Sequence, residues 1–588
     1  MNLALFPFVI IICLVFAELS IGAEDGQTKA PAPRGPAVSF KVLGQDLSRS
    51  GYTFVTDDKG NARRAHIYAT KSWVVVRNAP DPMRIWTLWS AGKFGRVMVE
   101  ADNQGKGYSA SAHGTYLLNL EFARTQAHKL QNSLAATRSD GITISPSLTE
   151  EIGSALDALK SVEAANTDVE RAQLADAALE KLLFAHEKLV LESARAYIER
   201  YRKSDVRLQV ADDSGKPIPG VRVQVRQTSR DFLVGHNSMG QVEKYRDKFL
   251  GIVNYATLPF YLRGLASNPH EYQWGPIESN RQWNADHGIQ VKGHPLTWFF
   301  KGTLPDYFVE MSWDEKAQYC EELTRRNVAH FKGKIDKWDV INEAHGWANL
   351  DYPQKNLDDL TERVVRAARE ANPDALLVIN SCLPLGLYVQ WKQSEDVPTP
   401  YEYYERMNKR GVPYDVIGLQ MYNGIASPFP TCDITVMSEI LDRYARLGKP
   451  IHITEFSVPS DAAEWGSWHA DKWDESTQAE YVQAFYTLAF SKPHVDAITW
   501  WCFWDGANWV KNSGVLREDL SEKPAYSVLK RLVESWTTSL EGRTDANGTF
   551  SFRGFHGNYE ITCATDDQTV KATAHVGKQP AVVSVVLK

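Results

Sequence analysis

One stretch decides the fold: SWDEKAQYCEELTRRNVAHFKGKIDKWDVINE, residues 312–343. Ser312 and Glu315 have the spacing of a reciprocal capping box, in which each side chain binds a backbone N–H near the other, so a helix is predicted over Trp313–Phe331. The apolar run Trp338–Glu343 predicts a buried strand that ends in a carboxylate. This stretch therefore contains one helix followed by one buried strand.

The same alternation repeats on both sides of this unit. Eight short stretches are candidate strands: Phe232–Gly235, Gly251–Tyr255, Ile289–His294, Trp338–Glu343, Ala375–Asn380, Val416–Tyr422, Ile451–Phe456 and Ala497–Phe503. Further helices are predicted at Leu357–Ala371, Ile434–Leu447 and Ser476–Phe490. Parallel strands need crossover helices, and eight such units over about 300 residues match the size of a (β/α)8 barrel. We predict an α/β fold with a TIM barrel at residues 232–536; an open doubly wound sheet is the alternative, but no Gly-rich phosphate loop follows an early strand.

The flanking sequence predicts accessory β-sandwich and helical segments. Short alternating runs predict a β-sandwich-like N-terminal domain over 37–113, and Ala-, Leu- and Glu-rich residues 114–203 predict a helical spacer. Residues 205–230 alternate on both sides of a Gly/Pro turn and predict a β-hairpin, which is too small to be stable alone. Together with the strand-rich tail, 537–588, this hairpin resembles a carboxypeptidase-regulatory-like sandwich cut open. We expect the two pieces to pair around the inserted barrel; two independent appendages are the alternative.

Composition limits the class of partner. The chain has 588 residues, 43% of them hydrophobic and 23% charged, which is typical of a globular protein of two to four domains. Its net charge of −7 argues against nucleic acid as a partner. The apolar run Leu3–Ala17 predicts a signal peptide over 1–23, hence a secreted or periplasmic protein without stable membrane insertion. The remaining cysteines are scattered and predict neither a disulfide framework nor a zinc site.

Two carboxylates lie at the ends of predicted strands. Glu343 ends the fourth strand and Glu455 lies near the end of the seventh. In a TIM barrel the carboxyl ends of the strands carry the active site, and strands four and seven face each other across it. A retaining glycosidase needs one carboxyl group to protonate the leaving oxygen and a second, about 5 Å away, to attack the anomeric carbon. The pair therefore predicts a retaining glycoside hydrolase; a local salt bridge for each Glu is the alternative.

Four blocks strengthen this prediction. They are Gly293-His-Pro-Leu-Thr-Trp298, Trp338-Asp-Val-Ile-Asn-Glu343, Gly418-Leu-Gln420 and Ile451-His-Ile-Thr-Glu455. In this order the blocks resemble glycoside hydrolase family 10, the xylanase family. The resemblance implies an endo-1,4-β-xylanase acting on xylan or a related plant or algal glycan, with Glu343 as general acid/base and Glu455 as nucleophile.

The same resemblance implies contacts to the sugar. Asn342 is expected to hold a 2-hydroxyl group, and His294 and Trp298 to line the subsite where cleavage occurs. Gln420 falls on the motif of the sixth strand. Two aromatic side chains after the eighth strand are expected to wall the sugar site: Trp501 and Trp509.

Two regions depart from the family pattern. The family usually has a His two residues after the strand-six Gln, where this chain has Tyr422, whose phenol can bind the nucleophile but does not titrate near neutrality. After strand two the family has an acidic-Asn-x-Met-Lys-Trp block, whereas Thr257–Gly264 carries Phe260 at the Asn position and Arg263 in place of Lys. We expect both side chains to reshape the grip on sugars of the non-reducing side. Packing of Phe260 and Tyr261 in the barrel is the alternative.

Other chemistries lack their motifs. His345 follows Glu343 without the His-Glu-x-x-His spacing of a zinc helix, and no Gly-x-Ser-x-Gly elbow occurs. No metal and no cofactor are therefore expected. Two other functions stay open: a catalytically impaired glycan-binding protein, because the strand-two block is altered, and a β-glucanase that uses the same two carboxylates.

Overall fold

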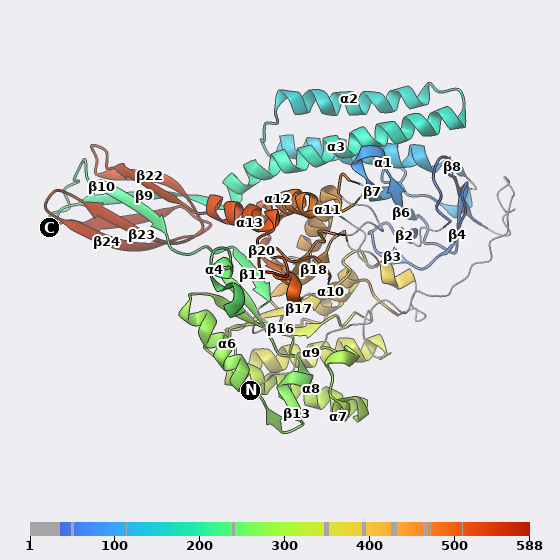
Figure 1. The fold of residues 1–588 in the computed structure, drawn as a ribbon. Helices are drawn as coiled ribbons and strands as arrows, with labels where there is room; N and C mark the ends of the chain where they lie inside the picture. Colours follow the sequence, from blue (N-terminus) through green and yellow to red (C-terminus); the bar gives the residue numbers. More distant parts are fainter. Residues whose placement is uncertain are drawn as a thin grey trace.

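A closed eight-stranded barrel lies at the centre of the computed structural model (Figure 1). The structure describes residues 36–48, 52–112, 114–237, 242–345, 352–390, 396–424, 432–461, 468–470, 472–507 and 510–588. Sheets of the N-terminal region lie on one side of the barrel, and a second β-rich unit that contains the C-terminus lies on the other. The barrel therefore sits between two accessory units.

The barrel confirms the predicted (β/α)8 architecture. Its parallel strands are, in spatial order, β11 Leu233–Asn237, β12 Tyr255–Pro259, β15 Gln290–His294, β16 Lys337–Asn342, β17 Leu376–Ser381, β18 Val416–Tyr422, β19 Ile451–Ser457 and β20 Val495–Trp500. The surrounding helices are α4 Arg246–Leu250, α6 Gly275–Asp286, α8 Trp313–His330, α9 Gln354–Ala371, α10 Pro400–Lys409, α11 Ile434–Ala445, α12 Glu475–Ser491 and α13 Pro524–Ser535. Because all eight strands run in one direction, their carboxyl ends meet at one mouth of the barrel.

Local sequence signals account for most of these elements. The capping box at the start of α8 is confirmed, since Ser312 accepts from the backbone of Glu315 and the Glu315 side chain accepts from the backbone of Ser312. One strand prediction is wrong in its bounds. Gly251–Tyr255 overlaps the observed strand β12 only at Tyr255, because Gly251 ends α4 and its N–H binds the carbonyl of Asp247.

The N-terminal sheets share one core with three long helices. The sheets have the strand orders β4-β5-β1-β8 and β3-β2-β6-β7. Their strands are β1 Val38–Lys41, β2 Phe54–Thr56, β3 Ala62–Arg63, β4 His66–Ala69, β5 Trp73–Arg77, β6 Arg84–Ser90, β7 Arg96–Ala101 and β8 Thr115–Leu117. Buried side chains of α1 (Leu118–Ser139), α2 (Pro146–Glu163) and α3 (Asp168–Tyr201) pack into the same cluster as Phe40 and Trp89. These helices, predicted as a spacer, therefore also form part of the core of the N-terminal unit.

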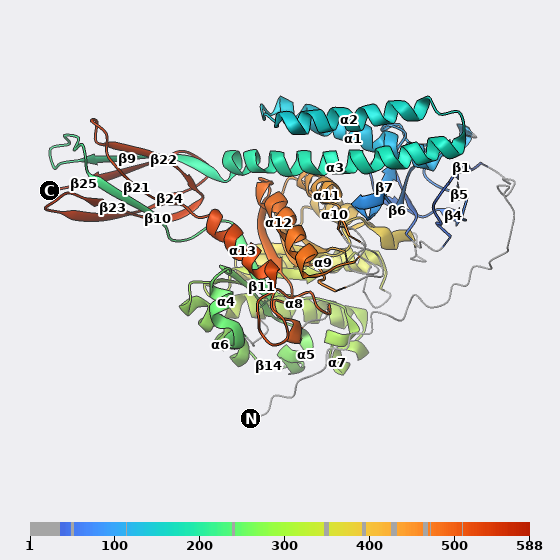
Figure 2. The ribbon, with the colours of Figure 1, turned by 45° about the horizontal axis from the view of Figure 1, so that its top comes forward.

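Helix α3 connects the accessory units along the barrel. It reaches from the N-terminal sheets to the C-terminal unit and passes over α11 and α12 (Figure 2). Its last residue is followed by Arg202, whose buried guanidinium donates to the carbonyls of Phe490 and Val495 of the barrel. Because these are charge-assisted contacts in a buried setting, they fix the end of α3 on the barrel.

The C-terminal unit is a sandwich of two sheets, with strand orders β21-β10-β23-β24 and β22-β9-β25. Strands β9 Lys203–Ala211 and β10 Arg222–Gln227 precede the barrel, whereas β21 Ser539–Arg543, β22 Thr549–Phe555, β23 Gly557–Ala564, β24 Thr569–Val576 and β25 Ala581–Val586 follow it. The predicted hairpin is wrong, because β9 and β10 lie in different sheets. Each strand buries alternate side chains, and the two rows face one core, to which Leu208 and Val223 contribute.

Deleting residues 541–588 is expected to expose the strands that precede the barrel. The deletion removes β22 and β25, both neighbours of β9, and takes β23 and most of β21 from β10. Buried valines such as Val206 and Val223 would then face water. We expect a lower melting temperature and faster proteolysis between residues 203 and 227. An unchanged melt together with unchanged cleavage would contradict a shared sandwich.

Two further observations concern the described part of the chain. None of its helices is both long enough and apolar enough to cross a membrane. The five cysteines in the described segments are buried and form no disulfide: Cys320, Cys382, Cys432, Cys502 and Cys563. The predicted signal peptide, 1–23, lies outside the described residues.

Candidate active site

Glu343 follows β16 directly at the mouth of the barrel. Its backbone has φ of 57°, an uncommon left-handed conformation for a residue other than glycine. The carboxylate is buried and accepts hydrogen bonds from Gln420 Nε2 at 2.8 Å and from Trp298 Nε1 at 3.1 Å. Burial raises the pKa of Glu343, and these two donors oppose the rise. Both donors are neutral, so they orient the carboxyl group without supplying a compensating charge.

Glu455 lies on β19 at the same mouth. Its Oε1 accepts from Asn380 Nδ2 at 3.0 Å, and its Oε2 accepts from the Tyr422 hydroxyl at 2.5 Å. Burial raises the pKa of Glu455 to about 8; the charge of Glu343 adds to the rise, and the Tyr422 hydrogen bond opposes it. The electrostatic influence of one carboxylate on the other agrees with their placement at one site.

A bridge of amide side chains connects the two carboxylates. Asn342 Oδ1 accepts from Asn380 at 2.8 Å and from Gln420 at 3.3 Å. Asn380 also donates to Glu455, and Gln420 also donates to Glu343. The three amide side chains come from the neighbouring strands β16, β17 and β18. The spacing of the amides therefore follows from the register of these strands. The bridge therefore connects both carboxyl groups and holds them in fixed positions.

Below the carboxylates lies a buried charged chain. Lys292 Nζ is 2.6 Å and His294 Nδ1 is 2.7 Å from the same oxygen of Asp339. Although burial acts in the opposite direction, Lys292 and His294 hold the pKa of Asp339 below its usual value. Burial lowers the pKa of His294, so its imidazole is neutral and donates from Nδ1 to the carboxylate. Its Nε2, 3.9 Å from Glu455 Oε1, is left as an acceptor toward the mouth.

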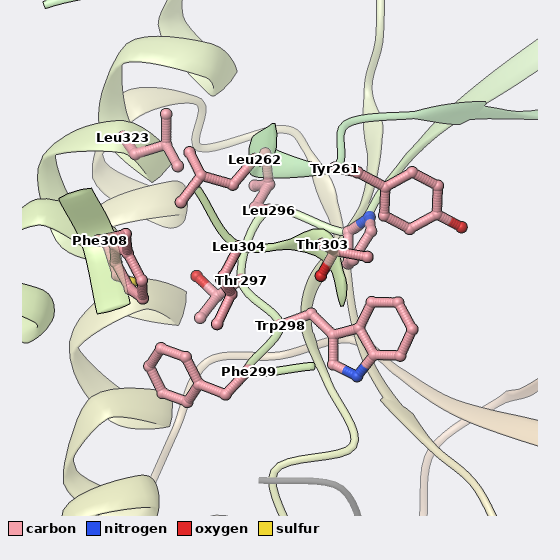
Figure 3. Close-up of a pocket in the computed structure, with 12 residues that line it drawn as sticks. Tyr261, Leu262, Leu296, Thr297, Trp298, Phe299, Thr303, Leu304, Phe308 and Leu323 are labelled. Carbon is pink, nitrogen blue, oxygen red and sulfur yellow. The ribbon is translucent and has the colours of Figure 1, made fainter. Parts of the chain in front are cut away.

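Aromatic side chains surround this polar cluster. Trp501 meets the His294 ring edge to face at 5.1 Å, and Trp298 stacks on Phe300 at 5.0 Å. Tyr261 lies between, with ring centroids 5.9 Å from His294 and 6.0 Å from Trp298. Figure 3 shows Tyr261 and Trp298 on one side of an apolar pocket behind the site. Such rings offer flat apolar faces of the kind on which sugar rings stack.

One expectation about the segment after β12 needs correction. Phe260 does not face the mouth, because it is buried against Phe331 and Trp338 with edge-to-face contacts. Glycine at position 293 leaves room for this packing, since a Cβ there would overlap the Trp338 ring. Arg263 donates to the carbonyls of Gly302 and Leu304 in the loop after β15 and its side chain is half exposed, so its contact with sugars of the non-reducing side stays a prediction.

Seven of the ten predicted site residues lie together at the mouth of the barrel. An eighth, Trp501, contacts the ring of His294. The seven are Glu343, Glu455, Asn342, His294, Trp298, Gln420 and Tyr422. Trp509 lies outside the described residues. Sequence reasoning missed Asn380 and Tyr261. The polar ending of the strand Ala375–Asn380 was the available signal for Asn380. For Tyr261, the sequence left packing in the barrel as an alternative and gave no site role.

Comparison with known proteins gives one family. Residues 247–532 match the model described as glycosyl hydrolase family 10. The chain is 25% identical over 395 residues to the anti-sigma-I factor RsgI6 of Acetivibrio thermocellus, covering 63% of this chain and 46% of that protein. It is 25% identical over 391 residues to endo-1,4-beta-xylanase 1 of Arabidopsis thaliana, covering 65% and 38%. The chain thus spans less than half the length of these two relatives.

Two further matches each cover about half of this chain and most of the other protein. Endo-1,4-beta-xylanase B of Thermotoga neapolitana is 26% identical over 328 residues, which cover 52% of this chain and 88% of that protein. Among solved structures, native xylanase 10B from Thermotoga maritima aligns with 25% identity and a TM-score of 0.43, covering 52% of this chain and 95% of that one.

Proposed function

Because its barrel belongs to glycosyl hydrolase family 10, we propose that this protein is a retaining glycoside hydrolase, an endo-1,4-β-xylanase that acts on xylan or a related hemicellulose. The observation that carries the proposal is the meeting of Glu343 and Glu455 at the mouth, each bound by two neutral donors and joined through Asn342. The similarity to the endo-1,4-beta-xylanases of Arabidopsis thaliana and Thermotoga neapolitana supports xylan as the substrate class.

The proposed reaction proceeds by double displacement. The ionised Glu455 attacks the anomeric carbon while Glu343 gives its proton to the departing glycosidic oxygen, which leaves a covalent glycosyl-enzyme ester. Glu343, now ionised, then takes a proton from water, whose oxygen attacks the same carbon and releases Glu455. Each displacement inverts the anomeric centre, so the product keeps the configuration of the substrate.

The remaining site residues are proposed to bind the sugar. Asn342, whose Oδ1 already accepts from both Asn380 and Gln420, would donate from Nδ2 to a sugar hydroxyl beside the carboxylates. His294 offers its Nε2 lone pair to another hydroxyl, and Trp298 and Trp501 offer ring faces. Donors and acceptors fixed before substrate arrives lose little freedom on binding, which favours the transition state.

Coupled ionisation gives the two carboxyl groups different tasks. Two buried carboxylates in electrostatic contact bind one proton as a pair, because the charge of the first opposes ionisation of the second. When Glu455 ionises, its charge raises the proton affinity of Glu343, which keeps the proton that the leaving group needs. The reactive form is therefore the singly protonated pair, with Tyr422 and Asn380 stabilising the anion on Glu455.

Replacing Tyr422 with Phe is expected to move the acidic limb of the pH profile upward. Burial raises the pKa of Glu455 to about 8 and the Tyr422 hydrogen bond opposes this rise, so its loss raises that pKa further. Because the nucleophile works only when ionised, kcat/KM at a given pH below the limb falls. A hydrogen bond to a charged group contributes about 1.5 kcal/mol or more, which corresponds to a shift of about one pH unit. The measurement is kcat/KM against pH for the wild type and for Tyr422→Phe. An acidic limb at the same pH in both proteins would contradict the prediction.

We further propose export of the chain. The apolar run Leu3–Ala17, followed by Glu18 and by small residues at Gly22 and Ala23, is typical of a signal peptide. Xylan is an extracellular polymer too large to enter a cell, so export places the enzyme with its substrate. Amino-terminal sequencing of the protein from the culture medium would locate the cleavage point; retention of residues 1–23 inside the cell would contradict export.

One screen tests the proposed function. Purified protein is incubated with xylan, arabinoxylan, mixed-linkage glucan and mannan, and released oligosaccharides are separated by length. We expect internal cleavage of the two xylans, with the β-anomer formed first when the reaction is followed by NMR. Release only from mixed-linkage glucan would indicate a β-glucanase, and binding to a glycan without release would indicate an impaired glycan-binding protein.

A further inference from the structure

The N-terminal unit, defined as residues 36–201, is built into the barrel and not merely tethered to it. Phe54 and Trp86 stack on each other and belong to the same hydrophobic cluster as the core of the barrel. Arg63 makes two hydrogen bonds to Glu402 of α10, at 2.6 and 3.0 Å, and Gln390 donates to the carbonyl of Thr53. The unit therefore contacts segments that follow the strand β17.

One buried carboxylate of this unit holds the segment after the nucleophile strand. Glu187 on α3 is 5% exposed. Its two oxygens separately bind Trp468 Nε1 at 2.9 Å and His469 Nε2 at 2.8 Å. His469 has φ of 58° and packs against Phe94 of the N-terminal unit, with ring centroids 4.6 Å apart. A strained residue with a buried charged anchor indicates that the surrounding structure enforces this position.

A short series of contacts leads from Glu187 to the nucleophile. Trp468 packs edge to face on Tyr481 of α12 at 5.5 Å, and the Tyr481 hydroxyl accepts from Asn423 Nδ2 at 2.9 Å. The Asn423 backbone N–H binds the carbonyl of Ser457, which pairs with Tyr422 across strands β18 and β19. Tyr422 in turn donates to Glu455. The steps are ring contacts, hydrogen bonds and one pairing of neighbouring strands, and all of them join buried groups.

We infer that Glu187 is a positioning residue for the reaction, through which the N-terminal unit holds Trp468, Tyr481 and Asn423 so that Tyr422 stays hydrogen-bonded to the nucleophile. This inference rests on the proposed function for its kinetic consequence, but the contacts do not depend on it. Besides its hydrogen-bond partner His469, the titratable groups that face Glu187 come from the barrel. They are Cys432, Asp433 and Tyr481. Those facing Glu455 are Glu343, His294, Lys292, Asp339, Tyr261 and Tyr422.

Two substitutions of Glu187 test the kinetic consequence. In the Glu187→Ala variant the Trp468 and His469 N–H groups lose their acceptor, so we expect kcat to fall at least about tenfold, the size of a small misplacement at a reacting centre. The acidic limb should move upward in the same direction as in the Tyr422→Phe variant. Glu187→Gln keeps one acceptor oxygen and should recover part of both changes. Lys188→Ala is the matched control, because Lys188 lies next in α3 and pairs with Glu151 at the exposed surface.

The shape of the pH profile separates positioning from simple destabilisation. A variant that only loses folded protein shows the wild-type limb at reduced height, and this result in both Glu187 variants would overturn the inference. A kcat and a limb equal to those of the wild type would overturn it as well. If Glu187→Ala does not accumulate as folded protein, Glu187→Gln carries the comparison.

Hydrogen exchange tests the same inference without any substrate. Peptides that span residues 416–424 and 451–457 should exchange faster in Glu187→Ala than in the wild type and in Lys188→Ala, because the segment that carries Tyr422 has lost its outer support. Unchanged exchange in both peptides overturns the inference. Faster exchange combined with a wild type that cleaves no glycan would mean that the positioning contact is real and the proposed function is wrong.

Discussion

Replacing Glu455 with Ala should lower kcat by about 10⁴-fold or more on every glycan that the wild type cleaves, the scale on which removal of one catalytic group acts. The methyl group leaves no oxygen within reach of the anomeric carbon, so the covalent ester cannot form. Neighbouring donors, Tyr422 and Asn380, would remain in place around the gap. Kinetics with a chromogenic aryl glycoside give the required sensitivity.

Azide should restore turnover of the Glu455→Ala variant. A small anion fits the space of the lost carboxylate and attacks the anomeric carbon once, so the product is a glycosyl azide of inverted configuration, identifiable by NMR. The matched control is Glu480→Ala, which removes an exposed carboxylate from α12 and should leave turnover unchanged. Near-normal activity of Glu455→Ala on any substrate, or rescue with retained configuration, would show that Glu455 is not the nucleophile.

The sequence predicts the barrel well because local and tertiary preferences agree there. The strand Val416–Tyr422 is apolar apart from Gln420, as expected of a parallel strand buried on both faces, and the structure places it beside the strand that carries Glu455. The capping box at Ser312 fixes the start of α8 without any tertiary contact. The carboxylates at the ends of such strands then meet at the mouth because the topology leaves no other place for them.

Prediction fails where two structures satisfy the same local pattern. Alternation in β9 and β10 is equally compatible with one hairpin and with two strands facing each other across a core; only the pairing partners of the distant tail distinguish these arrangements. The adjacent aromatic residues Phe260 and Tyr261 are another example. The chain turns between them, so Phe260 enters the core beside Trp338 while Tyr261 faces His294, and no spacing rule reveals which ring points where.

Contacts between distant segments were beyond the sequence altogether. Lys292 and Asp339 lie in the interiors of two predicted strands, where a charged residue has no local explanation, and only the closed barrel brings their side chains within 2.6 Å. Glu187 belongs to a helix that composition alone describes as a spacer, yet it binds residues 281 and 282 positions away. Such pairs are set by docking of whole elements, for which a single sequence carries no periodic signal.

Replacing Glu343 with Ala should have an effect that depends on the leaving group. For xylan the departing sugar oxygen is a poor leaving group that needs protonation, so kcat/KM should fall by about 10²- to 10⁴-fold, the usual contribution of a general acid. A dinitrophenyl glycoside departs without protonation, so the first displacement should be nearly preserved, and the glycosyl-enzyme should accumulate because no base activates water in the second. Steady-state rates across a series of aryl glycosides, with a pre-steady-state burst for the most activated one, measure both effects. In addition, the basic limb of the pH profile should vanish, since the group whose deprotonation causes it has been removed. An equal loss of rate for activated and unactivated substrates would instead indicate that Glu343 only shapes the site, and the proton would then have to come from another group at the mouth.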